Sequence, residues 1–110
     1  MGKLIVLEVP GLTMEMVQRG DAAAHLFDLI SEGALAECDG LPPRLGEWIT
    51  DASPLRAIDE RIPVLRSRGE LAILSEAVFI HPRPIKGLRP GVRLTREQVA
   101  AHLREIVDAP

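Results

Sequence analysis

The chain has few of the residues that build several common kinds of functional site. Its 110 residues include one cysteine, Cys38, so an internal disulfide and a cysteine-rich zinc site are both excluded. Only Phe27, Trp48 and Phe79 are aromatic and tyrosine is absent, which argues against a platform for stacking nucleic-acid bases. We therefore expect an aliphatic core and a reducing compartment, the cytoplasm.

Strong charge and long hydrophobic runs are also lacking. The formal net charge is -3, and the 13 basic residues are spread along the chain without forming a stripe, which argues against binding to a phosphate backbone. No apolar run approaches the about 18 residues that a membrane helix needs. The short N-terminal apolar run is interrupted by Glu8 and is typical of a strand rather than a signal peptide. We expect a soluble protein without nucleic-acid or membrane partners.

What the sequence does contain is hydrophobic patterning for one α/β domain over residues 1–110, since 46% of the residues are hydrophobic and the length suits a single core. The aliphatic run from Lys3 to Val9 predicts a strand buried on both faces. A helix is predicted over about residues 21–32, capped by Asp21 and ended by Gly33 in a left-handed conformation. Residues 34–38 then predict a second strand.

The second half of the chain continues the alternation. Residues 44–52 are predicted to be irregular, with Trp48 as their apolar anchor. Ser53 as an N-cap, followed by Pro54 in the first turn, predicts the start of a helix. This helix is predicted to run to about Arg66 despite Pro63 and to end before Gly69.

The remaining segments predict a further strand, a loop and a final helix. Residues 71–74 predict a buried strand, and residues 77–80 either extend it past a bulge or form a separate strand. Residues 81–90 predict an extended loop. Thr95 and Gln98 form a capping box at the start of the last helix. The element order predicts a small, mostly parallel sheet of three to four strands flanked by helices.

Ligands of such sheets bind beyond the carboxyl ends of the strands, and three carboxylates are predicted there. Glu8, Asp39 and Glu76, joined by His25 or His81, would give an oxygen-rich site for Mg²⁺ or Mn²⁺. The alternative is that these carboxylates are exposed at strand ends and only keep the protein soluble.

Two more residues are candidates for binding, although no residue is predicted to be catalytic. Gly11 follows a strand, as in a phosphate-binding turn, and Thr13 lies beside it. Cys38 has no neighbour in the sequence that would activate its thiol, so a buried packing role is favoured. The hydroxyl residues Ser53, Thr50 and Ser75 lack the flanking glycines of a nucleophile elbow. We assign no function to His102 on the last helix.

Three stretches carry a family resemblance: Lys3–Thr13, Ala24–Ala34 and Glu70–Val78. In this order they are similar to segments of the alkaline phosphatase superfamily, in particular its type I phosphodiesterase and nucleotide pyrophosphatase branch. The resemblance implies an alkaline-phosphatase-like core. It also implies lost chemistry, because Pro10 stands at the position of a metal-binding aspartate, and Glu76 and Ala77 replace the aspartate and histidine of a Ser-Asp-His-Gly motif.

Paired metals activate the nucleophile in that family, so losing ligands of both metals implies a miniature, catalytically degenerate relative. We therefore expect a non-catalytic interaction or regulatory module. One alternative is a metal-dependent phosphoester or phosphonate hydrolase that uses Glu8, Asp39 and Glu76 as substituted ligands of Mg²⁺, Mn²⁺ or Zn²⁺. Another is a small-molecule binder at the strand carboxyl ends.

The apolar segment Ala77–Ile80 also predicts a partner. A small sheet leaves its edges open, and an apolar edge strand favours pairing with a second copy of the chain. We expect a homodimer that forms by edge pairing at these residues.

Overall fold

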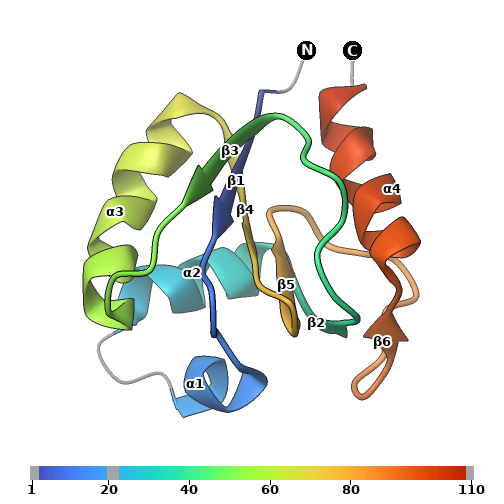
Figure 1. Ribbon diagram of the computed structural model, residues 1–110, viewed down its shortest axis with the longest axis horizontal. Helices are drawn as coiled ribbons and strands as arrows, with labels where there is room; N and C mark the ends of the chain where they lie inside the picture. Colours follow the sequence, from blue (N-terminus) through green and yellow to red (C-terminus); the bar gives the residue numbers. More distant parts are fainter. Residues whose placement is uncertain (1–2, 20–22, 109–110) are drawn as a thin grey trace.

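The protein folds as a mixed six-stranded sheet between two helical layers (Figure 1), in a computed structural model that describes residues 3–19 and 23–108. The strands are β1 Leu4–Glu8, β2 Ala34–Cys38, β3 Glu47–Thr50, β4 Glu70–Leu74, β5 Val78–His81 and β6 Arg93–Leu94. The helices are α1 Met14–Arg19, α2 Ala24–Glu32, α3 Leu55–Arg68 and α4 Arg96–Val107. The predicted α/β class is confirmed.

The strand order is β3-β1-β4-β5-β2-β6, and its directions differ from the prediction. β1 pairs in parallel with β3 and β4, and β2 with β6, whereas β5 is antiparallel to both β4 and β2. The expected mostly parallel sheet of three to four strands is therefore wrong in both respects. The physical reason is the segment after β4, where Ser75 N–H donates to the Val78 carbonyl oxygen at 2.9 Å and reverses the chain.

This reversal also corrects the expected edge at Ala77–Ile80. β5 lies inside the sheet, paired through residues 78–81 with β2 and through residues 79–80 with β4. Its backbone cannot present an open edge to a second copy. The two outermost strands of the sheet are instead β3 and β6.

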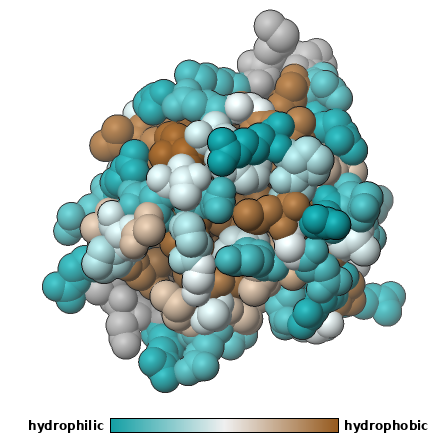
Figure 2. All heavy atoms as spheres, viewed as in Figure 1, coloured by the Kyte–Doolittle hydropathy of each residue, from teal (hydrophilic) through white to brown (hydrophobic). Residues whose placement is uncertain are grey.

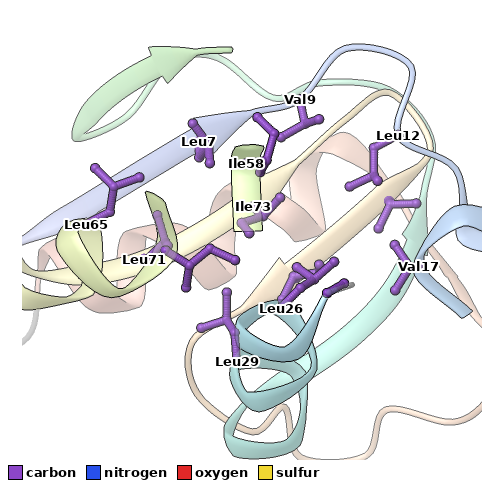
Figure 3. Packing of buried hydrophobic residues seen from close by; sticks show 14 of the residues in the cluster. Leu7, Val9, Leu12, Val17, Leu26, Leu29, Ile58, Leu65, Leu71 and Ile73 are labelled. Atoms are coloured by element: carbon purple, nitrogen blue, oxygen red, sulfur yellow. The ribbon is translucent and has the colours of Figure 1, made fainter. Parts of the chain in front are cut away.

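The core on one face of the sheet joins the strands to α1, α2 and α3 (Figure 3). Leu7 and Ile73 from β1 and β4 belong to one buried cluster with Leu26 of α2 and Ile58 of α3. Alternate strand residues supply this face because side chains of a strand point to opposite sides in turn. Fully burying side chains of this size contributes about 1.5–3 kcal/mol each, so this face anchors three helices.

The opposite face is covered by α4 together with two loops. Val6, Leu74 and Phe79 from the sheet form a second buried cluster with Val99 and Leu103 of α4. Leu41 and Leu45 from the loop before β3, and Ile85 and Leu88 from the loop after β5, pack against its margin. The predicted capping box at the start of α4 is confirmed.

Gly33 follows α2 but is not the left-handed cap that the sequence predicts. Its φ is -123°, an angle open to any residue. Glycine is needed for space, because a Cβ at this position would lie 1.9 Å from the His81 carbonyl oxygen. The predicted cap Asp21 lies outside the described residues.

Two further predictions of local structure are corrected. Residues 47–50 of the expected irregular segment form β3 beside β1. The predicted cap at Ser53 is wrong, since α3 begins after Pro54 and the Ser53 N–H donates to Asp51 Oδ1 at 2.9 Å.

The short helix α1 was not predicted at all. None of the helices in the described residues is both long enough and apolar enough to cross a membrane.

Candidate functional site

The carboxylate of Glu8 lies at the end of β1 and is held by the neighbouring edge strand. Its Oε1 accepts a hydrogen bond from Trp48 Nε1 at 2.9 Å and another from Thr50 Oγ1 at 3.2 Å. Both donors belong to β3, on the side of β1 that faces away from β4. The side chain is therefore tied to the β3 margin of the sheet.

Asp39 follows β2 and is paired on the opposite margin. Its Oδ1 lies 3.2 Å from Arg93 Nη1, and the same guanidinium lies 3.1 Å from Glu37 Oε2. Because β4 and β5 lie between β1 and β2, three strand spacings, about 14 Å, separate the strands that carry Glu8 and Asp39. The two carboxylates point to different neighbours and do not converge.

Glu76, the third predicted ligand, is exposed in the turn between β4 and β5, where its carbonyl oxygen accepts from Gly40 N–H at 2.8 Å. Within residues 3–19 and 23–108, no group of three His, Cys, Asp or Glu side chains is arranged to hold a metal ion. Metal binding at Glu8, Asp39 and Glu76 therefore stays a prediction.

Neither of the two histidines proposed as additional ligands forms a metal-holding group with these carboxylates in the part of the chain that the structure describes. His25 is exposed in the first turn of α2. His81 is 1% exposed, with Nε2 3.0 Å from the His102 carbonyl oxygen and Nδ1 2.8 Å from the Arg83 carbonyl oxygen. The His81 ring thus joins β5 to α4 and to the loop that follows β5.

The predicted binding residues Gly11 and Thr13 shape the chain between β1 and α1. Gly11 has a φ of +80°, a left-handed conformation that favours glycine, and open space where a Cβ would stand. Thr13 Oγ1 accepts from Met16 N–H at 3.2 Å and so satisfies a free donor of the first helical turn. This contact gives Thr13 a structural role.

Ser75 is fully buried and its hydroxyl is saturated with internal hydrogen bonds. The oxygen accepts from Ala77 N–H at 3.1 Å and from Val78 N–H at 3.0 Å, and the hydroxyl donates to the Leu12 carbonyl oxygen at 2.7 Å. A serine hydroxyl has one donor and two acceptor positions. All three are used, so the side chain stabilises the β4–β5 turn and the segment after β1.

Cys38 is buried beside this turn, and its Sγ lies 3.5 Å from the Ser75 carbonyl oxygen. Burial, reinforced by the charge of Asp39, raises the pKa of the thiol to about 11. A thiol of this kind stays protonated near pH 7, whereas a nucleophile requires the thiolate. The predicted packing role of Cys38 agrees with this environment.

A hollow that the sequence did not reveal lies on the other side of the molecule from α2 and α3. We call it the α4 groove, a space of about 550 Å³ between the loop that follows β2 and the first three-quarters of α4. Its lining residues are Leu41, Pro42, Pro43, Arg96, Glu97, Ala100 and Arg104. It combines a proline wall with two arginines on one helix.

The arginines of the α4 groove differ in their surroundings from most arginines of the chain. Arg93 and Arg83 are engaged by carboxylates. Neither Arg96 nor Arg104 makes an ion pair or a side-chain hydrogen bond with any part of the chain that the structure describes. Both are exposed and are free to bind an anionic group.

A second, smaller hollow of about 330 Å³ lies between β2, α1 and the loop of residues 88–92. Leu35 and Ala36 line it from β2, and Leu88 and Val92 line it from the loop. Its one ionisable contributor from the sheet is Glu37, which is paired with Arg93. Arg89 also lines it and makes no ion pair within the described residues, so this hollow holds one unpaired cation where the α4 groove holds two.

Known proteins offer no guide to either hollow. No family model matches this chain, and no curated protein or solved structure matches it. The likeness to the alkaline phosphatase superfamily therefore stays a prediction from the three stretches that carry it.

The sequence contains one signal that could have pointed to the α4 groove. Arg96, Ala100 and Arg104 follow each other at intervals of four residues, which places a small residue between two long cations on one side of a helix. The opposite wall comes from residues 41–43, about 55 positions earlier in the sequence. No local sequence pattern predicts that residues 41–43 lie beside α4.

Proposed function

We propose that this chain is a non-catalytic α/β binding module and that its ligand occupies the α4 groove. One observation supports this most: the side chains of Glu8, Asp39 and Ser75 are used in internal contacts. Arg96 and Arg104, in contrast, have no internal partner among the described residues. A binding module needs free recognition groups on a stable scaffold. The α4 groove supplies them.

Hydrolysis at the carboxyl edge would require groups that are already occupied. Ser75 would have to give up three hydrogen bonds to act as a nucleophile. A metal ion at Asp39 would have to displace the Arg93 guanidinium. Both changes break contacts between separate elements, which supports the non-catalytic proposal over the metal-dependent hydrolase.

The test is to strip the protein with EDTA and to measure its melting temperature with and without Mg²⁺, Mn²⁺, Zn²⁺ and Ca²⁺. A ligand that binds only the folded state raises this temperature by mass action. We expect no ion to raise it, and no turnover of p-nitrophenyl phosphate or bis-p-nitrophenyl phosphate.

A rise of several degrees together with metal-dependent turnover would overturn the proposal. Glu8→Gln is then the decisive variant, because it removes a carboxylate charge but retains an oxygen that can accept from Trp48 and Thr50. Loss of both metal effects in this variant would establish Glu8 as a ligand and the chain as a hydrolase.

Homodimerisation remains a further proposal, and its location moves from residues 77–80 to β3. The Asp51 N–H donates to the Glu8 carbonyl oxygen, so by alternation the backbone groups of Trp48 and Thr50 face outward. These outward groups would allow a second copy to pair along β3.

A further inference from the structure

We propose that the α4 groove binds an extended acidic peptide in which two carboxylate side chains flank an apolar residue, in the pattern acidic–x–apolar–x–acidic. This inference rests on the proposed binding function and names the class of partner. Three features of the groove carry it: the spacing of its arginines, the apolar surface between them, and the sign and distribution of its charges.

The spacing of the arginines sets the length of the ligand. Arg96 and Arg104 are eight residues apart on α4, and a helix rises 1.5 Å per residue, so their backbones are about 12 Å apart along the axis. In an extended peptide, side chains four residues apart point to the same side and are separated by about 13 Å. Two carboxylates at these peptide positions would therefore face the two guanidinium groups.

The lining of the groove between the two arginines is apolar and can contact an apolar side chain of a ligand. Ala100 lies midway between them on the helix and is 3% exposed, so no long side chain stands between the two arginines and the methyl group itself adds little accessible surface. Leu41, Pro42 and Pro43 form the facing wall. The peptide residue between the two acidic positions points in the same direction as they do, so an apolar side chain there would contact the partly buried Leu41 and the exposed Pro43.

The aliphatic stem of Arg96 packs against the backbone of Gly40, and this contact restricts the conformations of an otherwise exposed side chain. A Cβ at Gly40 would lie 3.2 Å from the Arg96 Cδ, so the aliphatic part of this side chain runs directly over the glycine backbone. A cation held in place loses less conformational freedom when it forms an ion pair. Glycine at position 40, with a φ of +92°, leaves room for the arginine.

The charges favour an acidic peptide over a nucleic acid. Glu97 lines the groove beside the two arginines, and the whole chain carries a formal charge of -3. A polyanion with a charge on every unit would meet this repulsion along its whole length. A peptide with two separated carboxylates can match the two arginines and place a neutral residue near Glu97. On the face of the molecule that Figure 2 shows, hydrophilic residues predominate and hydrophobic residues lie in separate patches.

The probe is a capped synthetic peptide of sequence GETVTEG, added to ¹⁵N-labelled protein while amide and arginine Nε chemical shifts are recorded. Two control peptides have matched length. GKTVTKG reverses the charges, and GETEVTG keeps the composition but moves the carboxylates two residues apart. We expect saturable shifts at residues of the α4 groove with GETVTEG, weaker binding with GETEVTG and none with GKTVTKG.

Variants of the protein test the two arginines separately. Arg96→Met removes the charge but keeps the aliphatic stem that packs over Gly40, and Arg104→Met is its equivalent at the other end. Exposed ion pairs are individually weak, so we expect each variant to lose roughly three- to fivefold in affinity and the double variant more. Added NaCl should weaken wild-type binding, since exposed charges are screened.

Arg56→Met is the matched control. Arg56 is exposed on α3, which covers the other face of the sheet, and its substitution should leave the affinity unchanged. Equal melting temperatures of all variants would show that the fold is intact.

The inference would be overturned if GETVTEG gave no saturable shift, or if the charge-reversed peptide bound equally well. Shifts confined to residues outside the groove, or tighter binding of a single-stranded oligonucleotide, would also overturn it. Concentration-dependent shifts of the groove without peptide would assign it to a second copy and would also overturn it. Metal-dependent turnover contradicts the proposed function, whereas failure of peptide binding without turnover contradicts only this inference.

Discussion

Cys38 illustrates at the residue scale how the fold determines the chemistry of a side chain. Its thiol is 2% exposed and packs in the cluster beneath α4. The carbonyl oxygen of Ser75 lies within hydrogen-bond distance of the thiol. The sulfur therefore behaves as a small apolar group with a satisfied donor.

We expect iodoacetamide to alkylate Cys38 about a hundredfold or more slowly in the folded protein than in the urea-unfolded chain at pH 8. A thiol pKa of about 11 in the fold, against about 8.5 for a free cysteine, leaves far less of the reactive thiolate. Mass spectrometry of timed samples measures both rates. Comparable rates in the two states would show that the thiol is exposed or activated.

At the scale of elements, Asp59 connects two helices that the sequence treats as independent. It lies on α3, is 5% exposed, and its Oδ1 accepts from the Leu26 N–H at 2.8 Å, with the His25 N–H 3.4 Å from Oδ2. Ala23, at the cap position of α2, has no side-chain oxygen with which to do this. A carboxylate of α3 thus caps the start of α2, where negative charge is favourable.

We expect Asp59→Ala to lower the free energy of unfolding by about 2 kcal/mol, because it leaves buried N–H donors of α2 without an acceptor. Asp59→Asn retains one oxygen and should lose about half as much. Urea unfolding followed by circular dichroism measures both. Asp28→Ala, an exposed position on α2, is the control and should stay within about 0.5 kcal/mol of wild type. A neutral result for Asp59→Ala would mean that water caps α2.

The elements also show which parts of the fold a sequence can predict. β2 and α4 carry their own signals, an apolar run between turn residues and a capping box, and the prediction of both is confirmed. β3 has only four residues and is a strand because β1 lies beside it. The direction of β5 depends on the internal hydrogen bonds of Ser75 rather than on a residue pair typical of hairpin turns.

The candidate site was less predictable than the fold for the same physical reason. Glu8 and Asp39 were expected to converge because both follow strands, but the strand order puts two other strands between them. Arg96 and Arg104 look like ordinary residues of a solvated helix face. Their significance depends on a loop from another part of the chain.

At the scale of the whole molecule, ion pairs join elements at the periphery of the sheet. Arg83 Nε lies 2.6 Å from Glu70 Oε1 and connects the loop after β5 to β4. Arg68 Nη2 of α3 lies 2.6 Å from Glu47 Oε2 of β3. Hydrogen bonds from Ser53, with the Arg61 guanidinium, lower the pKa of Asp51 to about 2. The bond from Arg83 likewise lowers the pKa of Glu70.

These lowered pKa values predict the response to acid. A carboxyl whose pKa is lower in the folded state stabilises the fold above its unfolded pKa of about 4, and this contribution is lost as the pH falls through the folded value. We expect the urea midpoint to decline from pH 4 towards pH 2. Urea unfolding across this range measures it.

The variant Asp51→Asn isolates the contribution of Asp51 to this acid response. It should lower the urea midpoint at pH 6 and make the decline between pH 4 and pH 2 shallower, because its side chain no longer titrates. Asp28→Asn, away from these pairs, serves as the matched variant and should follow wild type. A decline as steep in Asp51→Asn as in wild type would contradict the assignment.

The place of β1 between β3 and β4 has a consequence for the order in which the chain acquires its structure. Val6 pairs with Trp48 on one side and with Ala72 on the other, so β1 is synthesised 42 residues before its first partner and 66 residues before its second. Contacts between residues so distant in sequence slow folding. During synthesis the aliphatic segment Leu4–Leu7 must stay unpaired, and an unpaired hydrophobic strand is open to aggregation. A strand that lies between two others in the finished sheet is therefore unprotected while the chain is being made.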